Sequence, residues 1–179
     1  SMPSVKFSRI VTFSSEDPIH KADNVLSQDG AKKWRTKDVG EKQLSAVIQL
    51  DRPYKLNAVD IGNNGSAFVE VQVCRQGQNE FKVLLASASF LSPIESRNEQ
   101  NLCRVRMFGA DKLNKEVSQE KWDQVKVVCT QPFNKHLKYG LSFLTVHSPT
   151  VDDESTTRSC TMKKLGAFAL KDESDDANL

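Results

Sequence analysis

Polar and apolar residues alternate one by one through much of this chain. In the segment AFVEVQV, apolar side chains recur at Ala67, Val69, Val71 and Val73. Successive side chains of a β-strand point to opposite faces, so a period of two indicates strands with one face in a core. Runs at 44–50, 103–107 and 125–129 repeat the spacing, and Phe81, Val83 and Leu85 form another such run. The pattern predicts an all-β fold of antiparallel strands.

Turn residues bound the expected strands. The strand at 44–50 is expected to end at Asp51-Arg52-Pro53, because proline cannot donate to a ladder. The run 56–61 is expected to end at the sequence GNNG, residues 62–65. Many short strands with frequent turns favour two sheets packed face to face as a sandwich. We expect short helices over 21–26 and 111–120.

Length and charge indicate one domain and a tail. The 179 residues fit a single β-sandwich domain at 2–149, followed by an acidic, largely disordered tail or linker at 150–179. Residues 151–179 carry three net negative charges, which leaves five net positive charges before them in a chain of net charge +2. This excess is compatible with a polyanionic partner but is common on solvated surfaces. Within the tail, 165–170 could add an edge strand.

The apolar runs and the first residues of the chain indicate where the protein is located. No apolar run approaches the roughly 18 residues that a membrane helix needs, so no membrane association is expected. The first residues lack a secretory signal, and Ser1 before Met2 resembles the remnant of a removed tag, so we expect an intracellular protein. Nothing indicates an obligate dimer, and a monomer is expected.

The sequence lacks the common motifs for catalysis and metal binding. The sequence has no nucleophile elbow, phosphate loop, zincin motif or calcium loop. Its three histidines lie at separate predicted turns or strand ends, and its four cysteines form no metal-ligand pair, so we interpret them as reduced thiols. Neither an enzyme, a metal nor a cofactor is expected, although residues that meet only in space could still form a triad.

One aromatic residue breaks the alternation. If Val69 and Val71 face the core, Phe68 and Glu70 face outward, so a phenyl ring sits beside a carboxylate on the polar face. A loop or the tail could cover Phe68. Alternatively, the ring could form a protein contact, because aromatic residues are enriched at interface centres and a neighbouring charge can fix orientation.

Two clusters of basic residues are also candidate binding sites. If Val105 and Met107 point inward, Arg104 and Arg106 lie outward, where two guanidiniums could pair with carboxylate or phosphate, or simply be solvated. Around Trp34, cations at Lys32, Lys33, Arg35 and Lys37 could accompany stacking on an unpaired base. A tryptophan such as Trp34 is more often a core anchor, and Trp122 is expected to be structural.

Several long blocks together suggest a family. They are DIGNNGSAFVEVQV at 60–73, RVRMFG at 104–109, WDQVKVVCTQPF at 122–133 and YGLSF at 139–143. In this order and at compatible spacing, they resemble the amino-terminal domain family of X-ray repair cross-complementing protein 1. The resemblance runs from about residue 5 to residue 147. The tail sequence KKLGAFALKDE resembles the segment that follows that domain.

The resemblance implies a fold and a function. The fold would be a galactose-binding-domain-like jelly roll, and the function a non-catalytic, nuclear scaffold role in base excision and single-strand break repair. The family's domain binds DNA polymerase beta, through a patch that corresponds here to Phe68, Glu70, Val83 and Arg106, with Arg97 as a weaker member. It is also described as binding nicked or gapped DNA, for which our own candidates are Lys32, Lys33, Arg35, Arg104 and Lys126.

Two departures and two alternatives accompany this interpretation. Vertebrate relatives carry a pair of cysteines that can form a disulfide switch, but Phe13 and Lys21 stand at the matching positions, so no such switch is expected. The chain also stops before the family's later domains, so we expect either a shortened form, which Ser1 favours, or a shorter relative that contains only this domain. The alternatives are a carbohydrate-binding sandwich, for which loop residues Asp51 and Asn63-Asn64 are sparse, and DNA binding as the main task, with steep salt dependence.

Overall fold

The computed structural model describes residues 3–28 and 30–149. Within them, Ser4–Ser148 form one compact unit. Its strands are β1 (Phe7–Phe13), β2 (Trp34–Arg35), β3 (Leu44–Lys55), β4 (Ala58–Asn64), β5 (Phe68–Cys74), β6 (Lys82–Ser89), β7 (Val105–Phe108), β8 (Lys121–Thr130) and β9 (Gly140–His147). Its helices are all short: η1 (Ala22–Ser27), α1 (Pro93–Arg97), η2 (Ala110–Lys112) and α2 (Lys115–Ser118).

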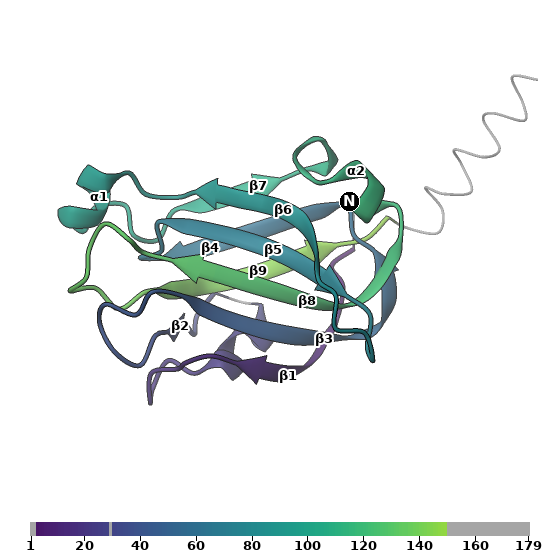
Figure 1. Cartoon of the computed structure of the whole chain (residues 1–179), viewed down its shortest axis with the longest axis horizontal. Coiled ribbons are helices and arrows are strands. Elements are labelled where there is room, and N and C mark those ends of the chain that lie inside the picture. The colour runs from purple at the N-terminus through teal and green to yellow at the C-terminus, as the bar shows by residue number, and fades with distance from the viewer. Residues whose placement is uncertain (1–2, 29, 150–179) are drawn as a thin grey trace, which may run out of the picture. The chain divides into compact units, whose positions relative to one another are not determined.

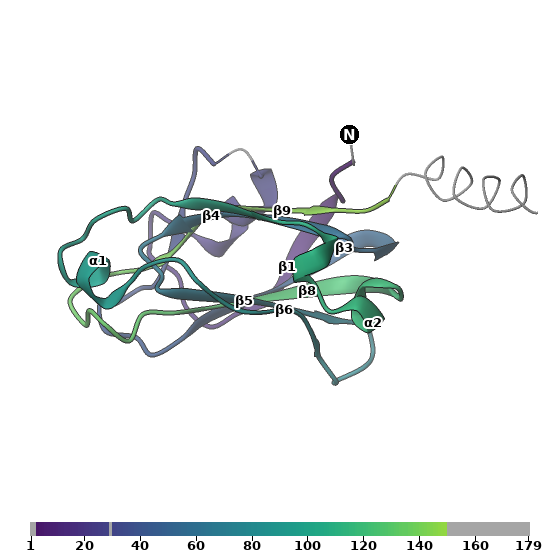
Figure 2. The ribbon, with the colours of Figure 1, turned by 90° about the horizontal axis from the view of Figure 1, so that it is seen from above.

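Two antiparallel sheets face each other in this unit (Figure 1). One has five strands in the order β1-β3-β8-β5-β6, and the other has four in the order β2-β9-β4-β7. Seen from above, β4 and β9 lie in one layer while β5, β6 and β8 lie in the other (Figure 2). The predicted all-β sandwich is confirmed.

Alternating apolar residues build the core between the layers. Ala67, Val69, Val71 and Val73 of one segment are all fully buried, as are Val125, Val127 and Cys129 on β8. The same holds for the inward set Leu44, Ala46, Ile48 and Leu50 on β3. Burying a side chain of this kind stabilises the fold by roughly 1.5–3 kcal/mol relative to leaving it exposed. The period of two therefore identified the core faces of these strands correctly.

Both tryptophans belong to this core. Trp34 is fully buried, and its indole nitrogen donates to the Ser15 carbonyl at 3.0 Å. Trp122 is also buried and donates to the Val117 carbonyl at 2.7 Å. The indole N–H groups are thus satisfied inside the protein. Trp34 is the core anchor, so its side chain is not available for stacking on a base.

Two predicted strand ends were wrong. β3 continues through Pro53, because the ladder to β8 is irregular between Gln49 and Tyr54 and requires no proline N–H there. β4 continues through Asn63 and Asn64 to the end of the GNN sequence. The Asn63 side chain bonds both the backbone N–H and the carbonyl of Ser66, so the polar groups of this buried turn are satisfied.

The helices are shorter and more numerous than expected. The helix expected at 21–26 is the 3-10 turn η1, and the one expected at 111–120 is divided between η2 and α2. Helix α1 was not predicted, although the sequence signals it. Ser92 and Glu95 form a reciprocal capping box around Pro93 at the first helical turn.

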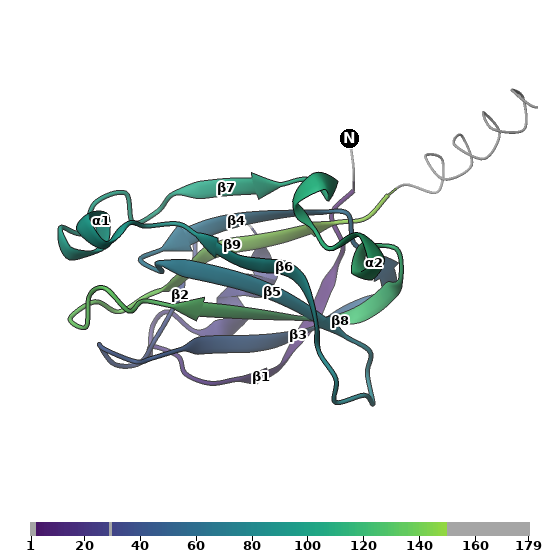
Figure 3. The same cartoon turned by 45° about the horizontal axis from the view of Figure 1, so that its top comes forward.

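The predicted orientation of β7 was wrong. Val105 and Met107 are 51% and 77% exposed, whereas Phe108 is buried. Since side chains alternate, Arg104 and Arg106 share the inner side of the strand with Phe108. β7 is the edge strand of its sheet, next to β4 (Figure 3), and Arg106 on β7 bonds the Ser89 carbonyl of β6 in the other sheet. Long arginine side chains can reach across this open edge, so apolarity did not identify the inner side there.

A glycine allows β2 to join the sheet. A Cβ atom at Gly140 would lie 1.9 Å from the carbonyl oxygen of Trp34, the residue near it on β2. The backbones of β2 and β9 therefore lie closer together here than a residue with a Cβ atom at position 140 would allow. This contact fixes the strand that carries both Trp34 and Arg35.

Two expectations concern features beyond the described sandwich. The expected tail at 150–179, including 165–170, lies outside the described residues. In the part of the chain that is described, no helix is long and apolar enough to cross a membrane.

Candidate functional site

The outer face of β5 presents Phe68 and Glu70. Both are half-buried, while the residues between and beside them are fully buried. Phe68 is partly covered by a loop residue, since the Phe133 ring lies 5.7 Å from it at an interplanar angle of 57°. Such a tilted pair is a favourable aromatic geometry. The ring is therefore outward, as the alternation predicted, and supported on one side.

A bulged pairing brings Val83 to the same face. The β5–β6 register shifts between Val69 and Gln72, so Leu84 and Leu85 are both buried while Val83 is 39% exposed. Val83 pairs with Gln72, whose amide nitrogen donates to Glu70 at 2.6 Å. The apolar Val83 thus lies across one strand from a carboxylate that a neighbouring amide orients.

Arg106 closes this face at the open edge of the sandwich. Its guanidinium donates to the carbonyl of Ser89 at 2.8 Å, and Ser89 pairs with Phe68 across the β5–β6 ladder. The guanidinium carbon also lies 4.7 Å from the ring centre of Phe108 and 5.7 Å from that of Phe90. These contacts fix the side chain while leaving it exposed.

We call Phe68, Glu70, Val83 and Arg106 the β5–β7 face. It combines a phenyl ring and a valine with one carboxylate and one guanidinium. Arg97 is exposed at the end of α1, next to Ser96, whose carbonyl accepts from Asn134 beside Phe133. Arg97 therefore lies near the Phe133 side of the face, without a direct contact to its four members in the described structure.

Arg104 has an internal role. It donates to both carboxylate oxygens of Glu95, at 3.1 and 2.5 Å, and to the carbonyl of Phe90 at 2.6 Å. Hydrogen bonds from Arg104 hold the pKa of Glu95 down to about 2, helped by the backbone of Ser92. The bidentate pairing suggested by sequence thus occurs within the chain. Sequence reasoning missed Glu95, which the capping pattern could have revealed.

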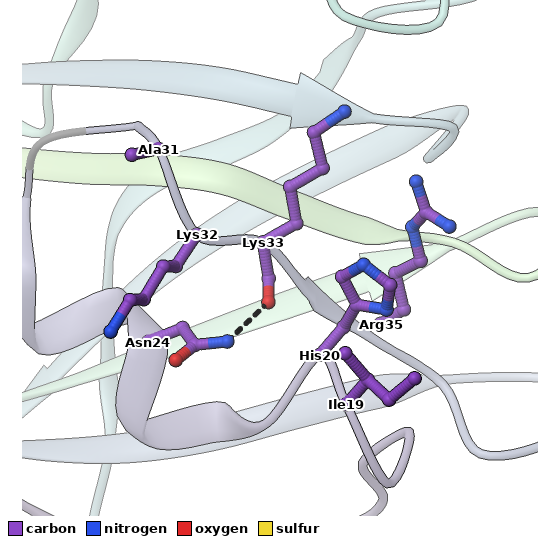
Figure 4. Close-up of a pocket in the computed structure, with 7 residues that line it drawn as sticks. All are labelled: Ile19, His20, Asn24, Ala31, Lys32, Lys33 and Arg35. Atoms are coloured by element: carbon purple, nitrogen blue, oxygen red, sulfur yellow. Dashed lines mark hydrogen bonds between the residues drawn. The ribbon is translucent and has the colours of Figure 1, made fainter.

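A basic pocket lies at the other sheet. It is a cavity of about 440 Å³ lined by Ile19, His20, Asn24, Ala31, Lys32, Lys33 and Arg35. Figure 4 shows the Lys33 and Arg35 side chains extending to the same side of β2 and its approach, with Lys32 pointing away from them. The structure therefore brings three predicted cations around one hollow.

Hydrogen bonds position the pocket's residues. The Asn24 amide donates to the Lys33 carbonyl at 2.8 Å, and the Arg35 N–H donates to the His20 carbonyl at 3.1 Å. Nε of Arg35 donates to Oδ1 of Asn64 at 2.6 Å. Asn64, which sequence reasoning did not assign to a site, therefore orients the guanidinium from β4.

The remaining cation candidates lie elsewhere. Lys126 is on β8 in the five-stranded sheet, with its ammonium 5.1 Å from the Phe81 ring centre, whereas Arg35 is on β2 in the four-stranded sheet. Arg104 is held at the β7 edge by Glu95. The five DNA candidates therefore do not form one continuous surface.

The sequence and fold of this chain match those of one protein family. A family model described as the XRCC1 N terminal domain matches residues 2–146. This chain belongs to that family. The DNA repair protein XRCC1 of Mus musculus is 45% identical over 185 residues, covering 99% of this chain but 29% of that protein. The chain thus spans under a third of the length of the XRCC1 proteins it matches.

Solved structures agree on the fold. A crystal structure of reduced XRCC1 bound to the catalytic domain of DNA polymerase beta is 46% identical, with a TM-score of 0.80, covering 83% of this chain and all of that one. A chitosan-binding module from Paenibacillus sp. is 12% identical with a TM-score of 0.57, covering 76% of this chain and 92% of that one. This second likeness shows the shared fold alone, and membership of the XRCC1 family does not favour the carbohydrate-binding alternative.

Proposed function

We propose that this chain is a non-catalytic scaffold module of base excision and single-strand break repair, which binds DNA polymerase beta. The main support is the XRCC1 structure bound to the polymerase's catalytic domain, because this chain covers its whole length at 46% identity. The module is proposed to act in the nucleus, as expected for a relative of DNA repair proteins, and as a monomer.

The β5–β7 face is the proposed polymerase-binding surface. Its centre is Phe68, which is outward but supported by Phe133, so little side-chain freedom remains to be lost on binding. Glu70 and Arg106 place opposite charges on either side, each already oriented by a hydrogen bond. An anchored aromatic residue with flanking charges is typical of an energetically dominant contact. Arg97 would lie at the rim.

A second proposed task is the binding of nicked or gapped DNA. Lys32, Lys33 and Arg35 gather around one pocket, and phosphate neutralisation by such cations supplies most sequence-independent affinity for nucleic acid. Lys126 lies on the other sheet, and the Arg104 guanidinium is already paired with Glu95. We therefore place the DNA contact at the three pocket cations.

The described histidines give no support to a catalytic role. His20 is paired with Asp17, which Lys138 also contacts at 2.8 Å. His147 pairs with Asp60 at 2.8 Å, and His136 is exposed on a loop. Among the described residues, neither pair has a serine or cysteine nucleophile hydrogen-bonded to the histidine ring.

Calorimetric titration with the catalytic domain of DNA polymerase beta tests the main proposal. Phe68→Ala is expected to weaken binding by about 2 kcal/mol or more, as truncation of an interface anchor does. Phe13→Ala is the matched control, because Phe13 is 48% exposed on β1 at the opposite edge of the same sheet. No binding by the folded parent would refute the proposal, and equal losses in both variants would remove Phe68 from the site.

DNA binding is tested separately by fluorescence anisotropy. Gapped duplex is expected to bind more tightly than intact duplex, with an affinity that falls steeply as salt increases. If the parent does not distinguish the two duplexes, the DNA part of the proposal is wrong while the polymerase part is unaffected.

A further inference from the structure

The basic pocket has an unbalanced charge. Its described lining contains Lys32, Lys33 and Arg35 but no carboxylate. One lining residue, His20, contacts a carboxylate: Asp17 accepts from His20 and forms an ion pair with Lys138 at 2.8 Å. Hydrogen bonding by Lys138 strongly lowers the pKa of Asp17, so this carboxylate stays ionised and its charge is offset by a lysine outside the pocket. Among residues 3–28 and 30–149, no carboxylate forms an ion pair with any of the three lining cations.

The lining cations also have hydrogen-bond donors without a partner among the described residues. Arg35 uses Nε for Asn64, so both terminal nitrogens of its guanidinium lack a partner in the described structure. The Lys33 ammonium has only the Cys103 sulfur, at 3.9 Å, which is a weak acceptor. Lys32 is exposed and makes no ion pair or side-chain hydrogen bond with the described residues. Arg35 and Lys33 lie on the same side, so their free donors can converge on one group (Figure 4).

The shape of the pocket and the burial of Trp34 limit the kinds of ligand that the pocket can bind. Because Trp34 is buried, the site offers no indole platform for a base, and recognition must rest on charge. The cations surround a hollow of about 440 Å³ rather than a flat strip. A flat or extended track suits the diester backbone of a duplex, whereas a hollow suits a group that projects from a chain end.

We propose that this pocket binds a phosphomonoester, supplied by the terminal 5′-phosphate at a DNA break. Such a group carries a charge of about −1.5 to −2 and three strong acceptor oxygens, more than a backbone diester offers. The free guanidinium nitrogens of Arg35 can bind two of these oxygens, and Lys33 supplies a further cation. The inference rests on the proposed binding of gapped DNA and specifies which feature of the gap is recognised.

The test compares two gapped duplexes that differ only in a 5′-phosphate or 5′-hydroxyl at the gap. The parent is expected to bind the phosphorylated duplex about tenfold more tightly, the size of one charge-assisted hydrogen bond. Arg35→Gln and Lys33→Gln are expected to bring this ratio close to one. Lys115→Gln, which removes an exposed cation on α2, is expected to keep the parent's ratio.

The outcomes separate this inference from the function on which it rests. Equal affinity of the parent for both gapped duplexes, each tighter than intact duplex, would overturn the phosphate pocket and leave DNA binding intact. If no duplex binds, titration of a 5′-mononucleotide followed by amide NMR decides the pocket alone. Shifts confined to 31–35 and 19–24 would support a phosphomonoester site, and their absence would overturn it.

Discussion

The ring of Phe68 lies 5.7 Å from the ring of Phe133, tilted by 57°. Phe68 belongs to β5, whereas Phe133 belongs to the loop that follows β8, so a loop fixes the position of a strand side chain on the outer face of the sheet. This loop is itself held, because the Phe133 N–H donates to the Gln131 side chain at 2.9 Å. The aromatic group proposed to meet the polymerase is therefore already in place before binding.

Removing the supporting ring should weaken polymerase binding less than removing Phe68 itself. Phe133→Ala is expected to lower the affinity by about 1 kcal/mol, the usual worth of an aromatic pair. Calorimetry with the polymerase catalytic domain measures the change, and Val39→Ala, which removes an exposed apolar side chain from another loop, is the control. A loss in Phe133→Ala equal to that in Phe68→Ala would show that Phe133 contacts the partner directly.

Acid should destabilise the domain partly through Glu95. Its pKa is held at about 2 by Arg104, below the ordinary 4.5, so the pair stabilises the folded state above about pH 4.5. That stabilisation is lost as the pH falls through about 2. Arg104→Met is expected to lower the melting temperature at pH 7 and to flatten the decline between pH 4.5 and 2. Arg9→Met, at an exposed position on β1, should leave the decline as in the parent, and an equally steep decline in both variants would contradict this role of Arg104.

The close approach of β2 to β9 should make Gly140 intolerant of a side chain. Gly140→Ala places a Cβ 1.9 Å from the Trp34 carbonyl oxygen, so the strand must move, at a cost of about 1–3 kcal/mol or more in unfolding free energy. In Gly109→Ala the added atom meets only the Asp111 side chain, at 3.2 Å, and little change is expected. Urea denaturation measures both variants. Equal stability of the two would show that the β2–β9 contact is not tight in solution.

The cysteines should differ in reactivity. Burial raises the pKa of Cys129 to about 12 and also raises the pKa of Cys74, whereas Cys103 is exposed. Because the thiolate is the reactive form, iodoacetamide is expected to modify Cys103 first in the native protein. Peptide mapping in a Cys160→Ser background measures the order. Early modification of Cys129 would indicate local opening of β8.

Sequence alternation predicted the core faces of β3, β5 and β8 because the two sides of each strand meet different environments, whereas on β6 it grouped Val83 with Leu85 and a bulge leaves Val83 exposed. It also placed Phe68 and Glu70 outward. It failed at Val105 and Met107, since β7 is a short edge strand whose inner side is completed by arginine stems and cation–ring contacts rather than by aliphatic side chains. The pattern of apolar residues alone therefore cannot predict which side of such an edge strand faces inward.

The basic pocket could be predicted only in part. Lys32, Lys33 and Arg35 are close in sequence, so their grouping was visible, but the residues that shape the hollow come from other segments. His20 joins through a backbone hydrogen bond to Arg35, and Asn64 reaches the guanidinium from β4. No local pattern encodes these long-range contacts. The burial of Trp34, which decides what the cations can recognise, depends equally on the whole sandwich.

Val5 donates a backbone hydrogen bond to Val146 at 2.8 Å, so the two ends of the sandwich lie side by side. A short linker can therefore join these ends, and new termini can be opened at Gly77, in the exposed turn between β5 and β6, where a Cβ would meet nothing within 4 Å. A circularly permuted domain of this kind keeps its strand pairings. The point from which the domain is tethered in a longer polypeptide can then be changed while the surfaces that it offers to partners stay the same.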